Sequence, residues 1–288
     1  MFRQQTMLFD IRHVTAYTYD KPVRLGPHLL RLSPRTDANQ RLLDFSCAIT
    51  PRPVLQSNTL DPEGNLVMRL WFDCSTTGLR IVFTSRTETL LENPYGYIMD
   101  SDATRLPMSY PHAEARLLAA CRDPGALTPG VAGLATAIAG QAKRNTLDFL
   151  VTLNRYLYSE FAREIRHRGA PQSPELTLAR RAGACRDLAV LFIALCRSQG
   201  IAARFVSGYQ AHTEAPAERR YLHAWVEVYI PGGGWCGYDP SHGTAVANGH
   251  VAVAASSHAS GAMPVSGSFY GNGVSSAMEF ELSIRTGT

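Results

Sequence analysis

The sequence has no long apolar run, and no stretch approaches the ~18 apolar residues that a membrane-spanning helix needs. Its N-terminus, MFRQQTMLFDIRHVTAYTYD, lacks the apolar core and the small-residue cleavage site of a secretory signal peptide. Cysteine is scarce: six residues, at 47, 74, 121, 185, 196 and 236, include no pair with the C-x-x-C spacing of a metal site. These absences favour a cytoplasmic protein with reduced thiols over a secreted disulfide scaffold or a membrane protein.

A strong excess of one charge is missing as well. The 288 residues include 28 Lys and Arg against 24 Asp and Glu, which gives a formal net charge of +4. That surplus is too small to predict binding to nucleic acid. The chain is 45% hydrophobic and 18% charged, which is typical of a folded soluble protein. Its length allows one large domain or two ordinary ones, and no internal repeat is visible.

The first third of the chain predicts antiparallel strands. LFDIRHVTAYTYD alternates apolar and polar residues until Lys21-Pro22, where we expect the strand to break. Residues 42–53 and 79–91 predict two more strands. DPEGN at 61–65 has the residues of a turn, and it predicts a hairpin between 54–60 and 66–74. We interpret residues 1–97 as an antiparallel β domain that resembles a sandwich.

The remaining residues, 98–288, differ from the first part in composition and pattern, and they predict a second domain that contains both helices and strands. Residues 112–121 and 145–168 are rich in alanine, leucine and arginine, and predict helices. Three short strands follow, at 203–210, at 221–230 with strict alternation, and from Trp235 to Asp239-Pro240. The tail from residue 245 is rich in small residues and precedes a final strand at 277–284. The expected fold class is therefore α+β.

Cys185 lies at the start of the most strongly patterned helix, in GACRDLAVLFIALCRSQG. An apolar stripe at i, i+3, i+4, i+7 and i+8 defines its buried face: Leu188, Leu191, Phe192, Leu195 and Cys196. Unsatisfied N–H groups and the positive end of the helix dipole favour a thiolate at Cys185, and the same groups can bind an oxyanion. Such a cysteine is either a nucleophile or an inert packing residue, and the other cysteines are interpreted as structural.

A thiolate nucleophile needs a base, and His223 is the candidate. In LHAWVEVYI, the alternation places His223, Trp225, Glu227 and Tyr229 on one face of a strand, with an apolar face behind them. A helix bearing Cys185 could lie against the face of His223. The alternative is a histidine on a half-exposed strand with no role in chemistry.

Asp239 is the candidate for the group that orients the base, and the turn at PGGG decides its direction. If Pro231 pairs with Gly234, the carboxylate points away from His223. If the loop is centred on Gly232, Asp239 stands opposite Trp225 and diagonal to His223, on the same face. Three consecutive glycines allow either loop, and a plain strand-ending turn at Asp239-Pro240 is a further alternative.

These motifs together resemble a known family. GACRDLAVLFIALCRSQGIAARFVSGY, HAWVEVYIPGGGW and GYDPSHG are similar to the core of bacterial transglutaminase-like proteins, often described as cysteine proteases. IRHVTAYTYDKPV, LLRLSPRTDANQ and DPEGN resemble the β domain that accompanies this core. The sequence departs from the family where Ser241-His242 replaces threonine-asparagine-like residues, and where Arg163 replaces an aromatic residue.

The resemblance implies a papain-like core with Cys185 as nucleophile, His223 as general base and acid, and Asp239 as orienting group. It implies acyl transfer on the amide carbonyl of a peptide or protein substrate, through a thioester. Hydrolysis is the favoured outcome, transamidation uses the same residues, and a non-catalytic peptide-binding module is a third interpretation. No cofactor, nucleic acid or membrane is expected. A metal site at His242, His250 and His258 is the least favoured interpretation, because these residues lack cysteine or carboxylate partners in the sequence.

Overall fold

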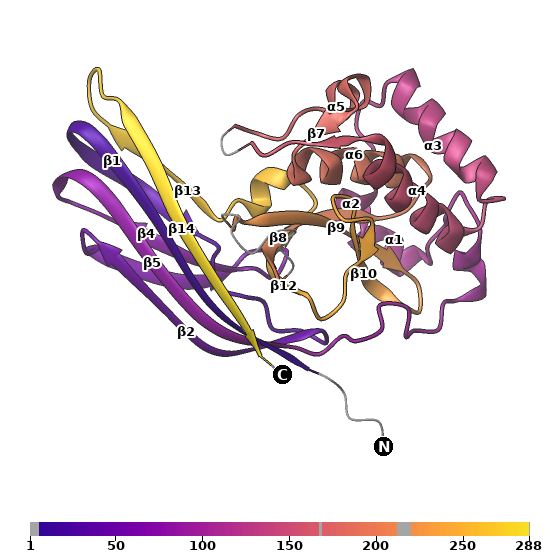
Figure 1. The fold of residues 1–288 in the computed structure, drawn as a ribbon, viewed down its shortest axis with the longest axis horizontal. Helices are drawn as coiled ribbons and strands as arrows, with labels where there is room; N and C mark the ends of the chain where they lie inside the picture. Colours follow the sequence, from indigo (N-terminus) through magenta and orange to yellow (C-terminus); the bar gives the residue numbers. More distant parts are fainter. Residues whose placement is uncertain (1–5, 167–168, 212–219, 288) are drawn as a thin grey trace.

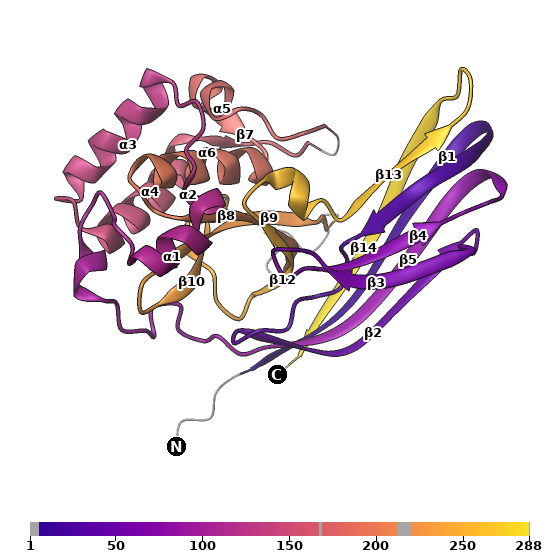
Figure 2. The ribbon, with the colours of Figure 1, turned by 180° about the vertical axis from the view of Figure 1, so that it is seen from behind.

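The computed structural model describes residues 6–166, 169–211 and 220–287. A curled antiparallel sheet forms one side of the molecule, and a smaller sheet covered by helices forms the other (Figure 1). Viewed from behind, the helices lie on the side of the small sheet that faces away from the curled sheet (Figure 2). The α+β class and the antiparallel N-terminal domain are confirmed, and the N-terminal strands form one continuous sheet.

The curled sheet has seven strands. They are β1 (Met7–Leu30), β2 (Gln40–Thr50), β3 (Leu55–Leu60), β4 (Leu66–Trp71), β5 (Ser75–Thr89), β13 (Val265–Tyr270) and β14 (Ser276–Gly287). The order β2-β5-β1-β4-β3 places the longest strand in the centre. The predicted break at Lys21-Pro22 is wrong: β1 continues past it, and the pairing with β5 is interrupted only between Thr18 and Val23. An irregularity of this kind accommodates a proline, which cannot donate to the ladder.

The hairpin around DPEGN is confirmed. β3 and β4 pair from Leu55 opposite Trp71 to Leu60 opposite Leu66. The carboxylate of Asp61 accepts hydrogen bonds from the N–H groups of Glu63 and Asn65, at 3.0 and 2.9 Å. The side chain of Asp61 therefore stabilises the turn that it begins, as an aspartate at the first position of a turn commonly does.

The C-terminal tail lies in a different part of the fold from the one predicted. We expected the final strand to belong to the second domain, but β14 pairs with β1 from Leu8 opposite Gly287 to Tyr19 opposite Ser276. β13 pairs with the second half of β1. The two ends of the chain therefore complete the same sheet, because β1 has a free edge that only these late strands cover.

The second part of the molecule contains the helices and the small sheet. Its helices are α1 (His112–Leu117), α2 (Ala119–Arg122), α3 (Pro129–Gln141), α4 (Thr146–Glu160), α5 (Pro174–Arg180), α6 (Cys185–Ser198) and the 3₁₀ segments η1 (Ser101–Thr104) and η2 (Ala259–Ala262). Its strands are β6 (Ala162–Arg163), β7 (Ala182–Gly183), β8 (Ala203–Gln210), β9 (His223–Ile230), β10 (Gly234–Asp239), β11 (Thr244–Ala245) and β12 (His250–Ser256). The helix predicted over 145–168 ends earlier, at Glu160, where the chain turns into β6; residues 167 and 168 lie outside the described residues.

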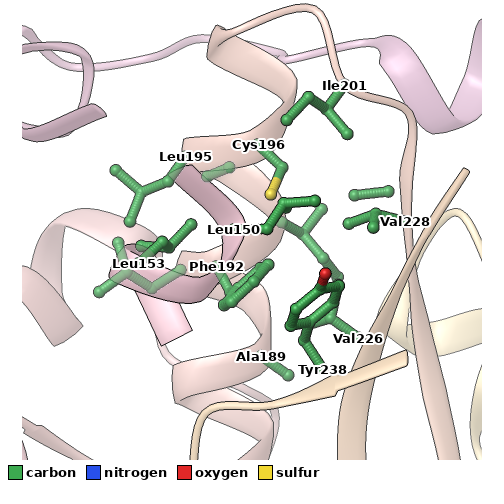
Figure 3. Packing of buried hydrophobic residues seen from close by; sticks show 14 of the residues in the cluster. Leu150, Leu153, Ala189, Phe192, Leu195, Cys196, Ile201, Val226, Val228 and Tyr238 are labelled. Atoms are coloured by element: carbon green, nitrogen blue, oxygen red, sulfur yellow. The ribbon is translucent and has the colours of Figure 1, made fainter. Parts of the chain in front are cut away.

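Helix α6 forms the centre of the second core. The apolar stripe predicted from the sequence is fully buried, and it packs against the apolar face of β9 (Figure 3). Figure 3 shows Phe192 of α6 beside Tyr238, on the side of Val226 of β9, whereas Leu195 lies on the side of Leu153 of α4. Gly200 takes a φ of +78° after the helix, which is the residue and conformation expected to end it. This packing fixes the position of the residue that begins the helix, Cys185.

All six cysteines are free thiols. Within the described residues, no helix combines the length and the apolar character needed to cross a bilayer, in agreement with the absence of long apolar runs from the sequence.

Candidate active site

Cys185 is the first residue of α6, and one residue, Ala184, separates it from the short strand β7. β7 pairs in parallel with β6, so Ala182 and Gly183 are held in extended form. Gly183 is needed here, because a Cβ at this position would lie 2.8 Å from the Cβ of Asp187. Cys185 itself is half-buried, whereas Cys196 in the same helix is fully buried. Of the two cysteines in α6, Cys185 is thus the less buried residue.

Asp187 fixes the start of α6. Its carboxylate is fully buried and accepts hydrogen bonds from the N–H groups of Ala184 and Gln172, both at 2.8 Å. Arg166 also forms an ion pair with it. One carboxylate therefore joins the residue before the nucleophile to the loop that precedes α5. The N–H groups of Cys185 and Arg186 lie in the first turn, where a helix offers them no acceptor.

The turn between β9 and β10 has the register that brings Asp239 to His223. Gly234 pairs with Ile230 and Tyr238 pairs with Val226, so the loop is centred on Gly232. One further step of this ladder places Asp239 opposite Trp225. Of the two registers that the glycines allowed, the second is the one observed.

The helix covers the face of β9 opposite to the one we suggested. The residues of β9 in contact with the α6 core are Ala224, Val226, Val228 and Ile230, the apolar face. His223 lies on the other face. Cys185 nevertheless reaches it, because His223 is the first residue of β9 and Cys185 is the first residue of α6, so the two meet at the edge of the packed layers. The N–H of the next residue, Ala224, also donates to the sulfur.

Cys185, His223 and Asp239 form a continuous chain of hydrogen bonds. His223 Nε2 lies 2.7 Å from Asp239 Oδ2, and His223 also hydrogen-bonds Cys185. Because Nε2 faces the carboxylate, Nδ1 is the nitrogen that faces the sulfur. His223 is 7% exposed and Asp239 is fully buried, so water screens these charges little.

The surroundings favour a thiolate at Cys185. Burial raises the pKa of the thiol, but the hydrogen bond and the positive charge of His223, with the N–H of Ala224, outweigh burial. The pKa of Cys185 therefore lies below its ordinary value. By contrast, burial is the largest influence on the pKa values of Cys47, Cys196 and Cys236, and all three are raised.

The surroundings also favour a charged imidazole. Burial lowers the pKa of His223, but the charge and hydrogen bond of Asp239, followed by those of Cys185, raise it above its ordinary value. Burial raises the pKa of Asp239, but its histidine neighbours hold that pKa well below the usual range. A lowered cysteine pKa and a raised histidine pKa mean that thiolate and imidazolium coexist as an ion pair between the two values.

Two further histidines, His242 and His250, contact Asp239, and the sequence analysis did not place them there. Oδ2 accepts hydrogen bonds from His242 Nδ1 at 2.9 Å and from His250 Nε2 at 3.1 Å, in addition to His223. Oδ1 accepts one from the N–H of Ser241 at 3.0 Å. His242 stands three residues after Asp239, which is a local signal, but His250 lies on β12 and only the sheet order brings it near.

The donor atoms of His223, Asp239 and His250 lie within 4.8 Å of one another, a spacing that a metal ion could bridge. Each nitrogen, however, is at hydrogen-bonding distance from the carboxylate, so the protons of the imidazoles satisfy it. His258, grouped with His242 and His250 in the sequence, is exposed beside η2 and is not part of this group.

Gly208 of β8 leaves space for the ring of Trp225, which lies beside the candidate site. It pairs with His223, and a Cβ here would lie 2.1 Å from the carbonyl oxygen of Val251 and 2.6 Å from the ring of Trp225. The Trp225 ring packs against both His223 and His250, with ring centroids 6.2 and 5.2 Å away. The missing side chain therefore lets the indole lie across β8.

We expect Gly208→Ala to destabilise the protein by about 1–3 kcal/mol, because the added methyl group forces the indole and β12 to move. Urea denaturation measures this change in the free energy of unfolding. Gly133→Ala is the control: it lies in α3 with open space around its Cβ, so we expect a gain of up to about 1 kcal/mol. Equal free energies for the two variants would contradict this account of Gly208.

Two family models match the chain. Residues 9–88 match the bacterial transglutaminase-like N-terminal region, and residues 132–240 match the transglutaminase-like superfamily. The second match contains Cys185, His223 and Asp239. The first covers most of the N-terminal part of the curled sheet.

The chain is also similar to curated proteins in sequence and to a solved structure in fold. An uncharacterized protein of Mycobacterium tuberculosis is 25% identical over 97% of this chain and 93% of its own length. A protein-glutamine gamma-glutamyltransferase of Pseudomonas aeruginosa is 33% identical over 98 residues, which are 31% of this chain and 15% of that protein. The crystal structure of a proposed cysteine protease from Cytophaga hutchinsonii superposes with a TM-score of 0.71 at 23% identity, covering 98% of this chain and 92% of that one. At this identity the likeness shows a shared fold.

Proposed function

The chain belongs to the transglutaminase-like superfamily, and on this basis we propose that it catalyses cysteine-dependent acyl transfer at amide bonds. Cys185 is the nucleophile, His223 is the general acid and base, and Asp239 orients the imidazole. The single observation that carries the proposal is the alignment of Cys185, His223 and Asp239, in which His223 contacts the sulfur and its Nε2 lies 2.7 Å from the buried carboxylate. Its pKa shifts are those of an activated thiol and not those of a packing cysteine.

In the first half-reaction, the thiolate of Cys185 attacks the carbonyl carbon of the amide. A C–S bond forms, and the electron pair of the C=O bond moves to the oxygen. The N–H of Cys185, in the first turn of α6, is placed to donate to this oxyanion. The C–N bond then breaks as the His223 imidazolium gives its Nδ1 proton to the departing nitrogen. The products are a thioester, a free amine and a neutral imidazole.

In the second half-reaction, water gives a proton to His223 and adds to the thioester. The C–S bond breaks, the thiolate leaves, and the imidazolium–thiolate pair is restored with a carboxylic acid as product. Throughout both steps Asp239 remains an anion and holds Nε2 of His223, so that Nδ1 stays directed at the reacting atoms. We favour hydrolysis because water is always available to the thioester.

Transamidation is the second candidate, and one finding favours it. The segment of this chain that is 33% identical to a relative matches a protein named protein-glutamine gamma-glutamyltransferase. In that reaction an amine replaces water in the second step and a new amide forms. Every residue named above keeps its role.

Alkylation by iodoacetamide across pH tests the nucleophile. Because the pKa of Cys185 is lowered, we expect labelling at pH 6 to be faster than for an ordinary thiol with a pKa of about 8.5. His223→Ala removes the cation, so labelling at pH 6 should fall about 10- to 100-fold and recover at high pH. Peptide mapping assigns the modified residue. Wild-type labelling no faster than that of a free thiol at pH 6 would remove the basis for an enzyme and leave the peptide-binding module.

Intact-mass spectrometry separates hydrolysis from transamidation. The wild-type protein is incubated with glutamine-containing peptides, with and without a primary amine such as cadaverine. Hydrolysis leaves products whose masses do not change with the amine, and transamidation adds the mass of the amine less ammonia to the acyl product. Under acid quench the thioester should appear as an adduct on the wild type and be absent from Cys185→Ala.

A further inference from the structure

Asp239 receives an unusual number of donors on one oxygen. Nitrogen atoms of His223, His242 and His250 all lie within hydrogen-bond distance of Oδ2, at 2.7, 2.9 and 3.1 Å. An ionised carboxylate only accepts hydrogen bonds, so the nitrogen of each imidazole that faces it carries the proton. Only His223 also contacts the nucleophile. His250 has no other hydrogen-bond partner among the described residues, whereas His242 Nε2 also lies 3.3 Å from Gln210 Nε2.

His250 is built as a neutral donor. Its ring is buried, and its Nδ1 has no hydrogen-bond partner among the described residues. Burial lowers its pKa more than the carboxylate raises it, so the ring stays uncharged with its one proton on Nε2. A neutral donor stabilises the anion of Asp239 without competing with His223 for the role of cation.

The groups that face Asp239 come from every neighbouring element. Cys185 approaches from α6, His223 from β9, His242 from the turn after β10 and His250 from β12. The side chain of Arg163, from β6, donates to the carbonyl of Ser241 at 3.2 Å, beside the site. Of these groups, His250 is the one whose position depends on the far edge of the small sheet.

The curled sheet holds the strand that carries His250. β12 is the edge of the small sheet, next to β8 alone, so its outer backbone groups lack a strand partner. The side-chain amide of Gln40 supplies a partner for Ala252. Its Oε1 accepts a hydrogen bond from the N–H of Ala252 at 2.7 Å, and its Nε2 donates to the carbonyl oxygen of Ala252 at 2.8 Å. The side-chain amide of Asn65 likewise accepts from the N–H of Ala255 and donates to its carbonyl oxygen, both at 2.8 Å. Both amides are almost fully buried.

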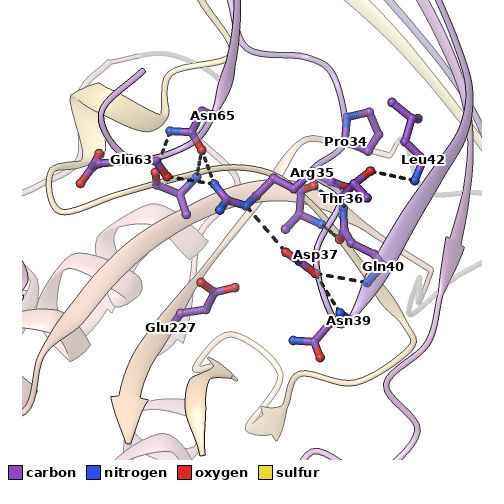
Figure 4. A network of polar contacts seen from close by, with 12 residues as sticks. Pro34, Arg35, Thr36, Asp37, Asn39, Gln40, Leu42, Glu63, Asn65 and Glu227 are labelled. Atoms are coloured by element: carbon purple, nitrogen blue, oxygen red, sulfur yellow. Dashed lines mark hydrogen bonds and ion pairs between the residues drawn. The ribbon is translucent and has the colours of Figure 1, made fainter. Parts of the chain in front are cut away.

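These two amides imitate the next strand of a sheet. Each pairs with the N–H and the C=O of one residue, as an adjacent strand would. Figure 4 shows Gln40 and Asn65 in one polar network with Arg35, whose guanidinium donates to Asn65 and whose main-chain carbonyl accepts from Gln40. The first residue of the strand so held, His250, is two residues from the one that Gln40 binds.

We propose that His250 is a positioning residue of the active site, and that the curled sheet completes the site by holding β12 through Gln40 and Asn65. The inference rests on the proposed function and assigns a task to the N-terminal domain. It identifies no new contact with substrate. His250 acts through Asp239, and the curled sheet acts through His250.

The test is the pH profile of Cys185 alkylation in His250→Phe and His250→Gln. Phenylalanine keeps a ring against Trp225 and loses the donor, whereas the amide nitrogen of glutamine replaces Nε2. With one donor gone, Asp239 is held less firmly and takes up a proton at higher pH, so it supports the imidazolium less well in acid. We expect His250→Phe to label about tenfold more slowly than wild type at pH 5.5 and within about twofold of it at pH 8. His250→Gln should restore most of the rate at pH 5.5.

Gln40→Leu tests the contribution of the curled sheet and changes no residue of the site. We expect a loss in the same direction, about threefold at pH 5.5, with little change at pH 8. Gln56→Leu, on the exposed strand β3, and His258→Phe, exposed beside η2, are the matched controls and should follow the wild type. If His250→Phe does not fold, Gln40→Leu alone decides the question.

A purely structural role would lower the alkylation rate of Cys185 by the same factor at every pH. The inference is therefore overturned if the pH profiles of His250→Phe and Gln40→Leu run parallel to that of the wild type, whether or not the rates are lower. A failure of the proposed function looks different. In that case the wild type itself labels as an ordinary thiol, before any variant is compared.

Discussion

Cys185→Ala is expected to reduce turnover of amide substrates at least about a thousandfold, because no other group near the site forms the covalent intermediate. The substitution removes the sulfur and leaves the N–H groups at the start of α6 in place. Any remaining rate should come from binding and from the oxyanion donors alone. The measurement is the rate of amine release from a peptide substrate identified by the intact-mass experiment.

Cys196→Ala is the matched control, since it makes the same change in the same helix. Cys196 is fully buried and burial raises its pKa, so it has no part in the chemistry. We expect it to keep wild-type turnover and to lose about 1 kcal/mol of stability. The double variant of Cys185 and His223 should be no slower than Cys185→Ala, because the two residues act as a unit. A Cys185→Ala enzyme with substantial turnover would exclude the covalent mechanism.

Asp187→Ala is expected to lower the free energy of unfolding by about 3–5 kcal/mol. The carboxylate is fully buried and satisfies Arg166 and the N–H groups of Ala184 and Gln172. Without it, a guanidinium and two buried donors lose their acceptor together. Because Ala184 precedes the nucleophile, labelling of Cys185 should slow as well. Guanidinium denaturation gives the free energy, and iodoacetamide labelling gives the reactivity.

The chain offers a close control for this substitution. Asp148 occupies the same third position of α4 that Asp187 occupies in α6, but its side chain is exposed. Asp148→Ala should cost no more than about 1 kcal/mol, the contribution of a favourable charge near a helix start. Similar losses for the two variants would mean that Asp187 acts through the helix dipole and not through its buried hydrogen bonds.

The parts of the site that the sequence predicted depend on local periodicity. The apolar stripe of α6 placed Cys185 at the beginning of a helix, and alternation placed His223 away from the apolar face of its strand. For Asp239 the sequence narrowed the question to two hairpin registers, and the loop centred on Gly232 decides between them. Each of these features is set by residues within about four positions of one another.

The parts that the sequence did not predict depend on how distant segments pack. We predicted that α6 packs on the face of β9 that carries His223. In the structure α6 packs on the opposite, apolar face, because burying that face against the helix removes more apolar surface from water. His250 and Gln40 gave no local signal, because they meet Asp239 and Ala252 only once the order of the strands is set. Periodicity indicates which face of an element is buried, and it cannot indicate against which partner.

The pairing of β1 with β14 has a consequence for biosynthesis. The ribosome makes β1 before β14, with the whole helical region between them. Until β14 is made, one edge of β1 is therefore unpaired, and a nascent chain exposes it to neighbouring nascent chains. A chaperone that acts on this protein would need to protect β1 for as long as the helical region is being synthesised.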